Sequence, residues 1–160
     1  FNAKEEMIAL VDYLKELASR VVYKVTHKLA KARALELLEE VKSDIYICDF
    51  HAEATSEKIA FGLYFDGRVN IIVGTHTHVQ TNDARVLSNG TMYMTDLGMT
   101  GALDGVIGVE KEGIIKKFLT GMPVRHNPME KGMKQFCGLV VDIDEKTRKV
   151  TKYDIINMVE

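Results

Sequence analysis

Apolar positions recur every third or fourth residue in several segments of the chain, which is the spacing that an amphipathic helix requires. In the first of these segments, Met7, Leu10, Val11, Leu14 and Leu17 would share one helical face. The segments with this pattern are residues 3–19, 29–42, 56–64 and 109–118. We therefore predict a helix in each of them.

Short runs of β-branched and other apolar residues lie between these helices, as in strands that are buried within a sheet. The predicted strands are residues 21–25, 45–48, 69–73, 85–87, 91–95, 139–143 and 149–155. Asn89-Gly90 predicts a tight turn between two of them, and residues 144–147 close a later hairpin. Because helices and strands alternate in the first half, we expect a layered α/β core, with residues 1–160 forming a single domain.

Composition and charge exclude several classes of protein. The chain has 160 residues, of which 46% are apolar and 28% charged, as in an ordinary globular domain. Its formal net charge of −2 gives no electrostatic signal for nucleic-acid binding. No apolar run approaches the ~20 residues that a membrane span needs, so no membrane partner is expected. Cys48 and Cys137 are too few for a disulfide framework, and we expect both to stay reduced in the cytoplasm.

Histidines follow two of the predicted buried strands, at the end where α/β sheets bind their ligands. His51 comes after the strand at 45–48, and His76 and His78 come after the strand at 69–73. In an extended backbone, residues two apart point the same way, so His76 and His78 are expected to face one centre. Since neutral imidazole binds first-row divalent metals well, we predict a metal site at these three histidines.

Polar residues beside the histidines are expected to support this site without ligating the metal. These residues are Asp49, Glu53, Thr77 and Asp96. For Asp96, a cap on a turn is an equally good interpretation. Three histidines could hold one zinc ion with an open position for water. Two metal ions about 4 Å apart repel each other and would need carboxylates from elsewhere in the protein.

Three blocks around these residues resemble the YmdB-type branch of the calcineurin-like metallophosphoesterases in sequence, order and spacing. The blocks are residues 49–58 (DFHAEATSEK), 74–81 (GTHTHVQT) and 95–101 (TDLGMTG), and the resemblance runs from about residue 31 onward. It implies a two-sheet α/β sandwich with flanking helices. It also implies a dinuclear centre of iron or manganese, with zinc as the alternative, in which His51 and His76 ligate one metal and His78 the other.

The resemblance further implies hydrolysis of phosphodiesters, with 2',3'-cyclic nucleotides as the favoured substrate class. The reaction would be an attack on phosphorus by a hydroxide that bridges the two metals, while both metals stabilise the phosphate oxygens. We therefore expect a small nucleotide or another phosphodiester as the substrate, and a homo-oligomeric protein.

The N-terminal motifs of that family do not occur in this sequence. They are an Asp after the first strand, a Glu-Asn pair, and an Asn-His motif that supplies the general acid. Because the chain starts at Phe1 without them, we expect an incomplete N-terminus, a general acid outside this segment, and no activity from the segment alone. Two other functions stay open: a non-catalytic regulatory or scaffold protein with a degenerate metal site, and a mononuclear zinc hydrolase that uses the three histidines.

Overall fold

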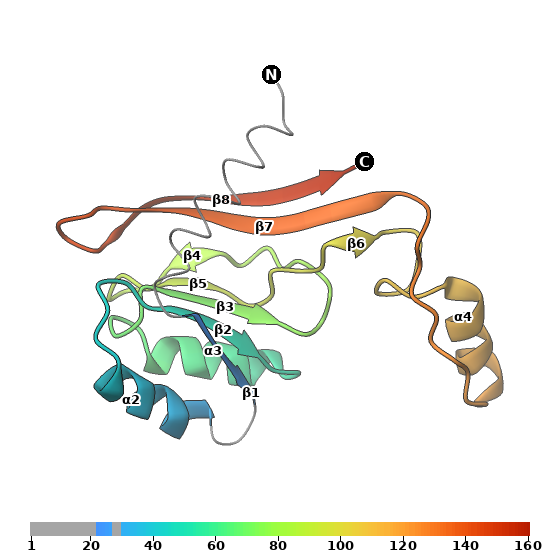
Figure 1. The fold of residues 1–160 in the computed structure, drawn as a ribbon, viewed down its shortest axis with the longest axis horizontal. Helices are drawn as coiled ribbons and strands as arrows, with labels where there is room; N and C mark the ends of the chain where they lie inside the picture. The colour runs from blue at the N-terminus through green and yellow to red at the C-terminus, as the bar shows by residue number, and fades with distance from the viewer. Residues whose placement is uncertain (1–21, 27–29) are drawn as a thin grey trace.

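The computed structural model describes residues 22–26 and 30–160 of the chain (Figure 1). The predicted helix at residues 3–19 lies outside the described residues. The strand predicted at residues 21–25 is present as β1 (Val22–Thr26). None of the described helices is both long and apolar enough to cross a membrane.

A five-stranded sheet forms the centre of the molecule, with the strand order β1-β2-β3-β5-β4 (Figure 1). Its other strands are β2 (Ile47–His51), β3 (Ile71–Thr75), β4 (Arg85–Val86) and β5 (Met92–Met94). The strands β1, β2, β3 and β5 run parallel, while β4 pairs antiparallel with β5 at the edge. This order places the carboxyl ends of β2 and β3 side by side, where α/β sheets bind ligands.

Helices cover one face of this sheet (Figure 1). They are α2 (Ala30–Glu40) and α3 (Thr55–Tyr64). Their apolar side chains pack with strand residues that include Phe50, Ile72 and Tyr93. The Phe50 and Phe61 rings stack with centroids 4.2 Å apart. Gly62 lets α3 approach the sheet closely, since a Cβ there would lie 2.4 Å from the Tyr93 ring.

A second, antiparallel sheet covers the opposite face, in the order β6-β7-β8 (Figure 1). Its strands are β6 (Gly101–Ala102), β7 (Lys134–Ile143) and β8 (Val150–Val159). Ile71, Val73 and Met94 point away from the helices and pack against apolar side chains of β7 and β8. The molecule therefore has three layers, and a further helix, α4 (Lys111–Thr120), lies at one end of them.

The predicted α/β fold with two sheets and flanking helices is confirmed, and the differences lie mainly at the ends of elements. The strands β2 and β3 begin two residues later than predicted and end two or three residues later, so that His51 and Thr75 are their last residues. The two-residue strand β6 is missed, because so short a strand has no periodicity to detect. The turn at Asn89-Gly90 is confirmed, with Gly90 at a φ of 102°. That residues 1–160 form one domain stays a prediction.

Candidate metal centre

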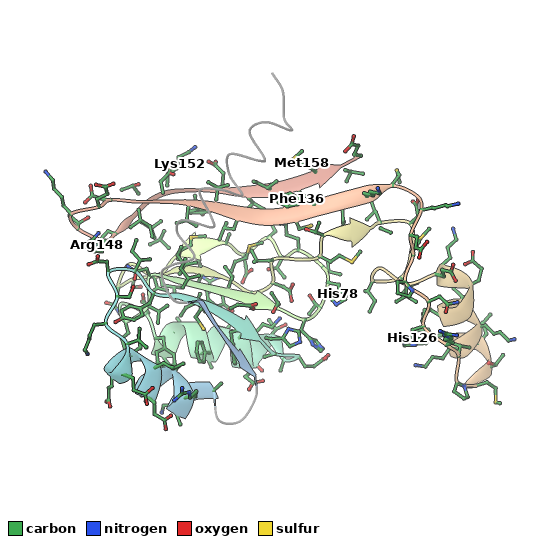
Figure 2. The ribbon with its side chains drawn as sticks, in the orientation of Figure 1. His78, His126, Phe136, Arg148, Lys152 and Met158 are labelled. Atoms are coloured by element: carbon green, nitrogen blue, oxygen red, sulfur yellow. The ribbon has the colours of Figure 1, made fainter. Side chains whose placement is uncertain are left out.

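The candidate site lies at the edge of the five-stranded sheet where β2 and β3 both end. His51 and Thr75 are paired in register as the last residues of these parallel strands. His76 follows Thr75 directly, so two of the three predicted histidines leave the sheet at neighbouring points. Figure 2 shows His78 in the loop that continues from the end of β3.

The imidazole rings of His51 and His76 are in direct contact. His51 Nε2 lies 3.1 Å from His76 Nδ1, and the rings meet edge to face with centroids 4.9 Å apart. Two imidazole nitrogens bound to one metal at about 2.0–2.1 Å, with an angle of about 90–110°, are themselves about 2.8–3.4 Å apart. The distance between these two nitrogens is therefore compatible with a pair of ligands on one metal ion.

In each ring, the nitrogen that faces away from the other ring (the outer nitrogen) is hydrogen-bonded to an oxygen atom. His51 Nδ1 lies 3.0 Å from Thr75 Oγ1, whose hydroxyl donates to Asp49 Oδ1 at 2.7 Å. Because that hydroxyl has one hydrogen, the His51 Nδ1–H is the donor to Thr75. The Nε2–H of His76 donates to Glu53 Oε2. Histidines that bind metals typically present their other N–H to an oxygen acceptor in this way.

These hydrogen bonds determine which nitrogens can bind a cation. With hydrogens on the outer nitrogens, neutral His51 and His76 present lone pairs to each other at Nε2 and Nδ1. Two lone pairs at this distance repel, whereas a metal ion between them is attracted to both. The arrangement therefore favours a cation between the two rings. Glu53 and the Thr75–Asp49 pair orient these rings through their outer nitrogens.

His78 does not join this pair. Its Nδ1 lies 3.0 Å from the carbonyl oxygen of Ile107. The backbone after β3 has a positive φ at His76 (124°) and at His78 (65°), so it is not extended there. The extended backbone from which His76 and His78 were expected to face one centre is therefore not found, and whether their rings face one centre stays a prediction. Within residues 30–160 no three His, Cys, Asp or Glu side chains are arranged to hold a metal together, and ligation by His51, His76 and His78 stays a prediction.

A buried ion pair lies beside this loop. Lys58 Nζ is 2.8 Å from Asp96 Oδ2, and both side chains are 1% exposed. Asp96 also accepts the backbone N–H of Thr77 at 3.0 Å and that of Gly98 at 2.9 Å. Burial by itself raises the pKa of Asp96, but the hydrogen bonds from Lys58, Thr77 and Gly98 hold the pKa of this carboxyl below its usual value.

Sequence reasoning missed Lys58 and Thr75 at this site. Lys58 does leave a signal, because it shares the buried face of α3 with Phe61, and a buried lysine needs an anionic partner. Thr75 becomes visible only when its register opposite His51 is known. Thr77 was expected among the supporting residues; its backbone N–H donates to Asp96, and its role at a metal site stays a prediction.

A family model for YmdB-like proteins matches residues 2–156. The chain belongs to the YmdB-like protein family. A 2',3'-cyclic-nucleotide 2'-phosphodiesterase of Bacillus subtilis (strain 168) is 53% identical over 126 residues, which are 78% of this chain and 47% of that protein. A putative phosphatase/phosphodiesterase of Mycoplasma pneumoniae is 43% identical over 126 residues, which are 78% of this chain and 44% of that protein. The chain thus spans about half the length of these curated relatives.

Solved structures share the fold of this YmdB-like chain. A hypothetical protein from Thermus thermophilus matches with a TM-score of 0.81 and 35% identity, over 87% of this chain and 57% of that one. A novel phosphatase from Mycoplasma pneumoniae matches with a TM-score of 0.79 and 34% identity, over 86% of this chain and 52% of that one. The family resemblance and the two-sheet α/β fold are therefore both confirmed.

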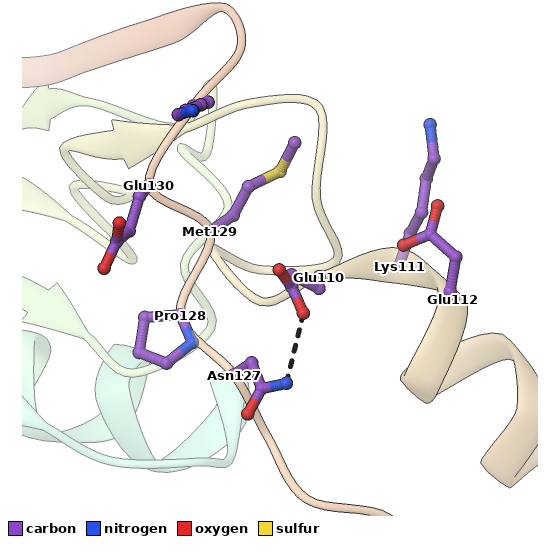
Figure 3. Close-up of a pocket in the computed structure, with 8 residues that line it drawn as sticks. Glu110, Lys111, Glu112, Asn127, Pro128, Met129 and Glu130 are labelled. Atoms are coloured by element: carbon purple, nitrogen blue, oxygen red, sulfur yellow. Dashed lines mark hydrogen bonds between the residues drawn. The ribbon is translucent and has the colours of Figure 1, made fainter.

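Two cavities lie near the loops of this YmdB-like chain. The smaller, of about 280 Å³, is next to His78 and is lined on its other side by residues of the second sheet such as Gln135. The larger, of about 720 Å³, lies between the start of α4 and residues 127–131 (Figure 3). Its described lining has no histidine, and Asn127 Nδ2 donates there to Glu110 Oε2 at 3.2 Å. Of these two cavities, the smaller is the one whose lining includes a predicted metal ligand, His78.

Proposed function

We propose that the protein carrying this sequence hydrolyses phosphodiesters, with 2',3'-cyclic nucleotides as its substrate class. The observation that carries the proposal is the contact between His51 and His76, whose outer nitrogens are hydrogen-bonded so that the facing nitrogens favour a cation. The site is at the carboxyl ends of parallel strands, where α/β enzymes place their chemistry. The name of the Bacillus subtilis relative, a 2',3'-cyclic-nucleotide 2'-phosphodiesterase, supports the same activity here.

We infer that two divalent metal ions serve this reaction, either iron or manganese, with zinc as the alternative. His51 and His76 would hold one ion, and His78 would contribute to the other after leaving the carbonyl of Ile107. Imidazole is a suitable ligand for each of these metals. When bound, such ions neutralise the charge of a phosphodiester and make water a stronger nucleophile at neutral pH.

The residues of this chain orient the site and accommodate the substrate. Glu53 and the Thr75–Asp49 pair keep a hydrogen on each outer nitrogen, which leaves the facing nitrogens to bind the cation. The cavity next to His78, of about 280 Å³, is close to the lower end of the ~300–1,000 Å³ range of small-molecule sites. A cavity of this size suits part of a mononucleotide better than a folded polymer.

We also propose a cytoplasmic, homo-oligomeric protein. Cys48 and Cys137 are both free thiols, as is usual in a reducing compartment. Phe118 and Leu119 on α4 are 84% and 80% exposed, which is typical of a surface that contacts another protein chain. A mass of one chain by light scattering would contradict the oligomer.

Metal analysis and a hydrolysis assay on the complete gene product test the proposed function. We expect two metal ions per chain and turnover of 2',3'-cyclic AMP. His76→Ala should lower kcat/KM by more than about 100-fold, because even the loss of a partner that orients a ligand typically costs 10–100-fold. His126→Ala is the matched control, since His126 lies in an exposed loop beside α4 (Figure 2) and should leave turnover unchanged.

The metal content also distinguishes the other functions that the sequence leaves open. Turnover with one metal ion per chain would favour a mononuclear zinc hydrolase. Protein without metal and without turnover would favour a regulatory or scaffold role. Full turnover by the His76→Ala variant would refute the assigned site whatever the metal content.

A further inference from the structure

We propose that the buried Lys58–Asp96 ion pair is a positioning device for the histidine loop (residues 76–78), and that it sets the affinity of the site for metal. The proposal rests on the function proposed above, since it takes these histidines as metal ligands. It gives a role to two buried side chains that we do not count among the metal ligands.

Asp96 holds the histidine loop at its centre. Its Oδ2 accepts the N–H of Thr77 at 3.0 Å, and the residues on either side of Thr77 are His76 and His78. Both histidines have a positive φ. Residues other than glycine keep such conformations only where the surrounding structure fixes them. The Thr77–Asp96 hydrogen bond lies at the point where this loop needs to be fixed.

Asp96 is itself held from several directions. Lys58 Nζ donates to Oδ2 at 2.8 Å, and the N–H of Gly98 donates to Oδ1 at 2.9 Å. The backbone N–H of Asp96 donates to Thr81 Oγ1 at 2.9 Å, and the N–H of Thr81 donates to Asp96 O at 3.0 Å. The chain is thus hydrogen-bonded to Asp96 at Thr77 and again at Thr81, on either side of His78.

Lys58 connects this arrangement to helix α3. Its side chain passes the end of β3 at Gly74, where an added Cβ would come within 2.9 Å of Lys58 Cδ. Asp96 is fully buried, and a buried carboxylate without a compensating cation is unfavourable. With Lys58 beside it, the carboxylate can accept the N–H groups of Thr77 and Gly98 at the same time.

Stability alone does not account for a pair of this kind. Buried ion pairs can often be replaced by apolar residues without loss of stability, because both charges give up their hydration on burial. An apolar replacement would not serve the histidine loop, however, because the N–H of Thr77 would lose its acceptor. Fold stability and metal affinity should therefore respond differently to substitution here.

Variants of the complete gene product test the proposal: Asp96→Asn, Lys58→Met, the charge-free double variant K58M/D96L, and Asp66→Asn as the control. Asp66 is a matched carboxylate, since it accepts the backbone N–H groups of Asn89 and Thr91 in the turn between β4 and β5. Calorimetric titration with Mn²⁺ measures the metal affinity, and thermal unfolding of the metal-free protein measures stability.

We expect Asp96→Asn and Lys58→Met to weaken Mn²⁺ binding about 10- to 100-fold, as is typical for residues that orient metal ligands. The double variant should regain most of the thermal midpoint that the single variants lose, while its Mn²⁺ binding stays weak. Asp66→Asn should lower the thermal midpoint and bind Mn²⁺ like the wild type.

Wild-type Mn²⁺ affinity in the Asp96→Asn or the double variant would overturn the positioning role. An equal loss of affinity in Asp66→Asn would also overturn it, because the effect would then follow general destabilisation. If Asp96→Asn does not fold, Mn²⁺ affinity is compared between the wild type and the double variant, which buries no unpaired charge. A wild-type protein that binds no Mn²⁺, iron or zinc would instead refute the proposed function, and this inference with it.

Discussion

Replacement of Gly74 by alanine should destabilise the protein and displace the histidine loop. Gly74 lies in β3, and a Cβ built there would be 1.7 Å from the carbonyl oxygen of Thr95 and 2.9 Å from Lys58 Cδ. Since the first of these neighbours is backbone, a change of side-chain rotamer cannot relieve the contact. The chain at Gly74 must therefore move away from Thr95 by more than about 1 Å to reach an ordinary van der Waals distance.

The magnitude follows from two contributions. Overpacking of a tight interior site costs about 1–3 kcal/mol. The displacement also breaks the hydrogen bond that the N–H of Leu97 donates to Gly74 O at 2.9 Å, which contributes about 1 kcal/mol. We therefore expect the Gly74→Ala variant to lose about 2–4 kcal/mol in its free energy of unfolding.

Urea unfolding followed by circular dichroism measures this loss, with Gly101→Ala as the matched control. An added Cβ at Gly101 meets nothing within 4 Å, so this variant should stay within about 0.5 kcal/mol of the wild type. Because His76 lies directly after β3, Gly74→Ala should also bind Mn²⁺ more weakly. Equal stability of the two glycine variants would refute the reasoning.

The remaining predictions concern the cavity next to His78 and the buried thiol of Cys48. If the cavity next to His78 holds the nucleotide, Gln135→Ala should raise KM for 2',3'-cyclic AMP about two- to tenfold in initial-rate assays, as expected for the loss of one hydrogen bond. Glu130→Ala, which changes the cavity at α4, should leave KM unchanged. Equal effects of the two substitutions on KM would contradict the assignment. Burial, and then the charge of Asp49, raises the pKa of Cys48 from 9.0 to about 12. The neutral thiol therefore contributes fully to the free energy of unfolding below about pH 9, and this contribution is lost as the pH rises toward 12. Between pH 8 and pH 10 the wild type should lose about 1.3 kcal/mol more than Cys48→Ala in urea unfolding, and parallel profiles would disprove this.

The central sheet and the contact between two histidines could be predicted because their signals are local. Continuous apolar runs indicate the buried strands β2 and β3, and residues that follow parallel strands meet at one edge of the sheet. His51 and His76 come together for this reason. Asp49 and Glu53 could be expected beside them because each is two residues from His51.

The direction of His78 and the partner of Lys58 could not be predicted, because both depend on distant parts of the chain. The alternation of side chains fails after β3, where the loop bonds to Asp96 and the Nδ1 of His78 meets the carbonyl of Ile107. Lys58 has the polarity of a surface residue, and its partner is 38 positions away. The interpretation of Asp96 as a turn cap is confirmed, since it accepts the N–H of Gly98; its role as a support of the metal site stays a prediction, although it also accepts the N–H of Thr77.

The three-stranded sheet has a consequence for how this chain is made. Val73, Met92 and Met94 are covered by β7 and β8, which are synthesised well after them. At about 5–20 residues per second, translation from Met94 to Val159 takes roughly 3–13 s. During those seconds α2 and α3 can cover one face of the parallel strands, while the apolar side chains on the other face stay exposed. Chaperones that shield apolar surface on the ribosome should therefore matter most in this interval.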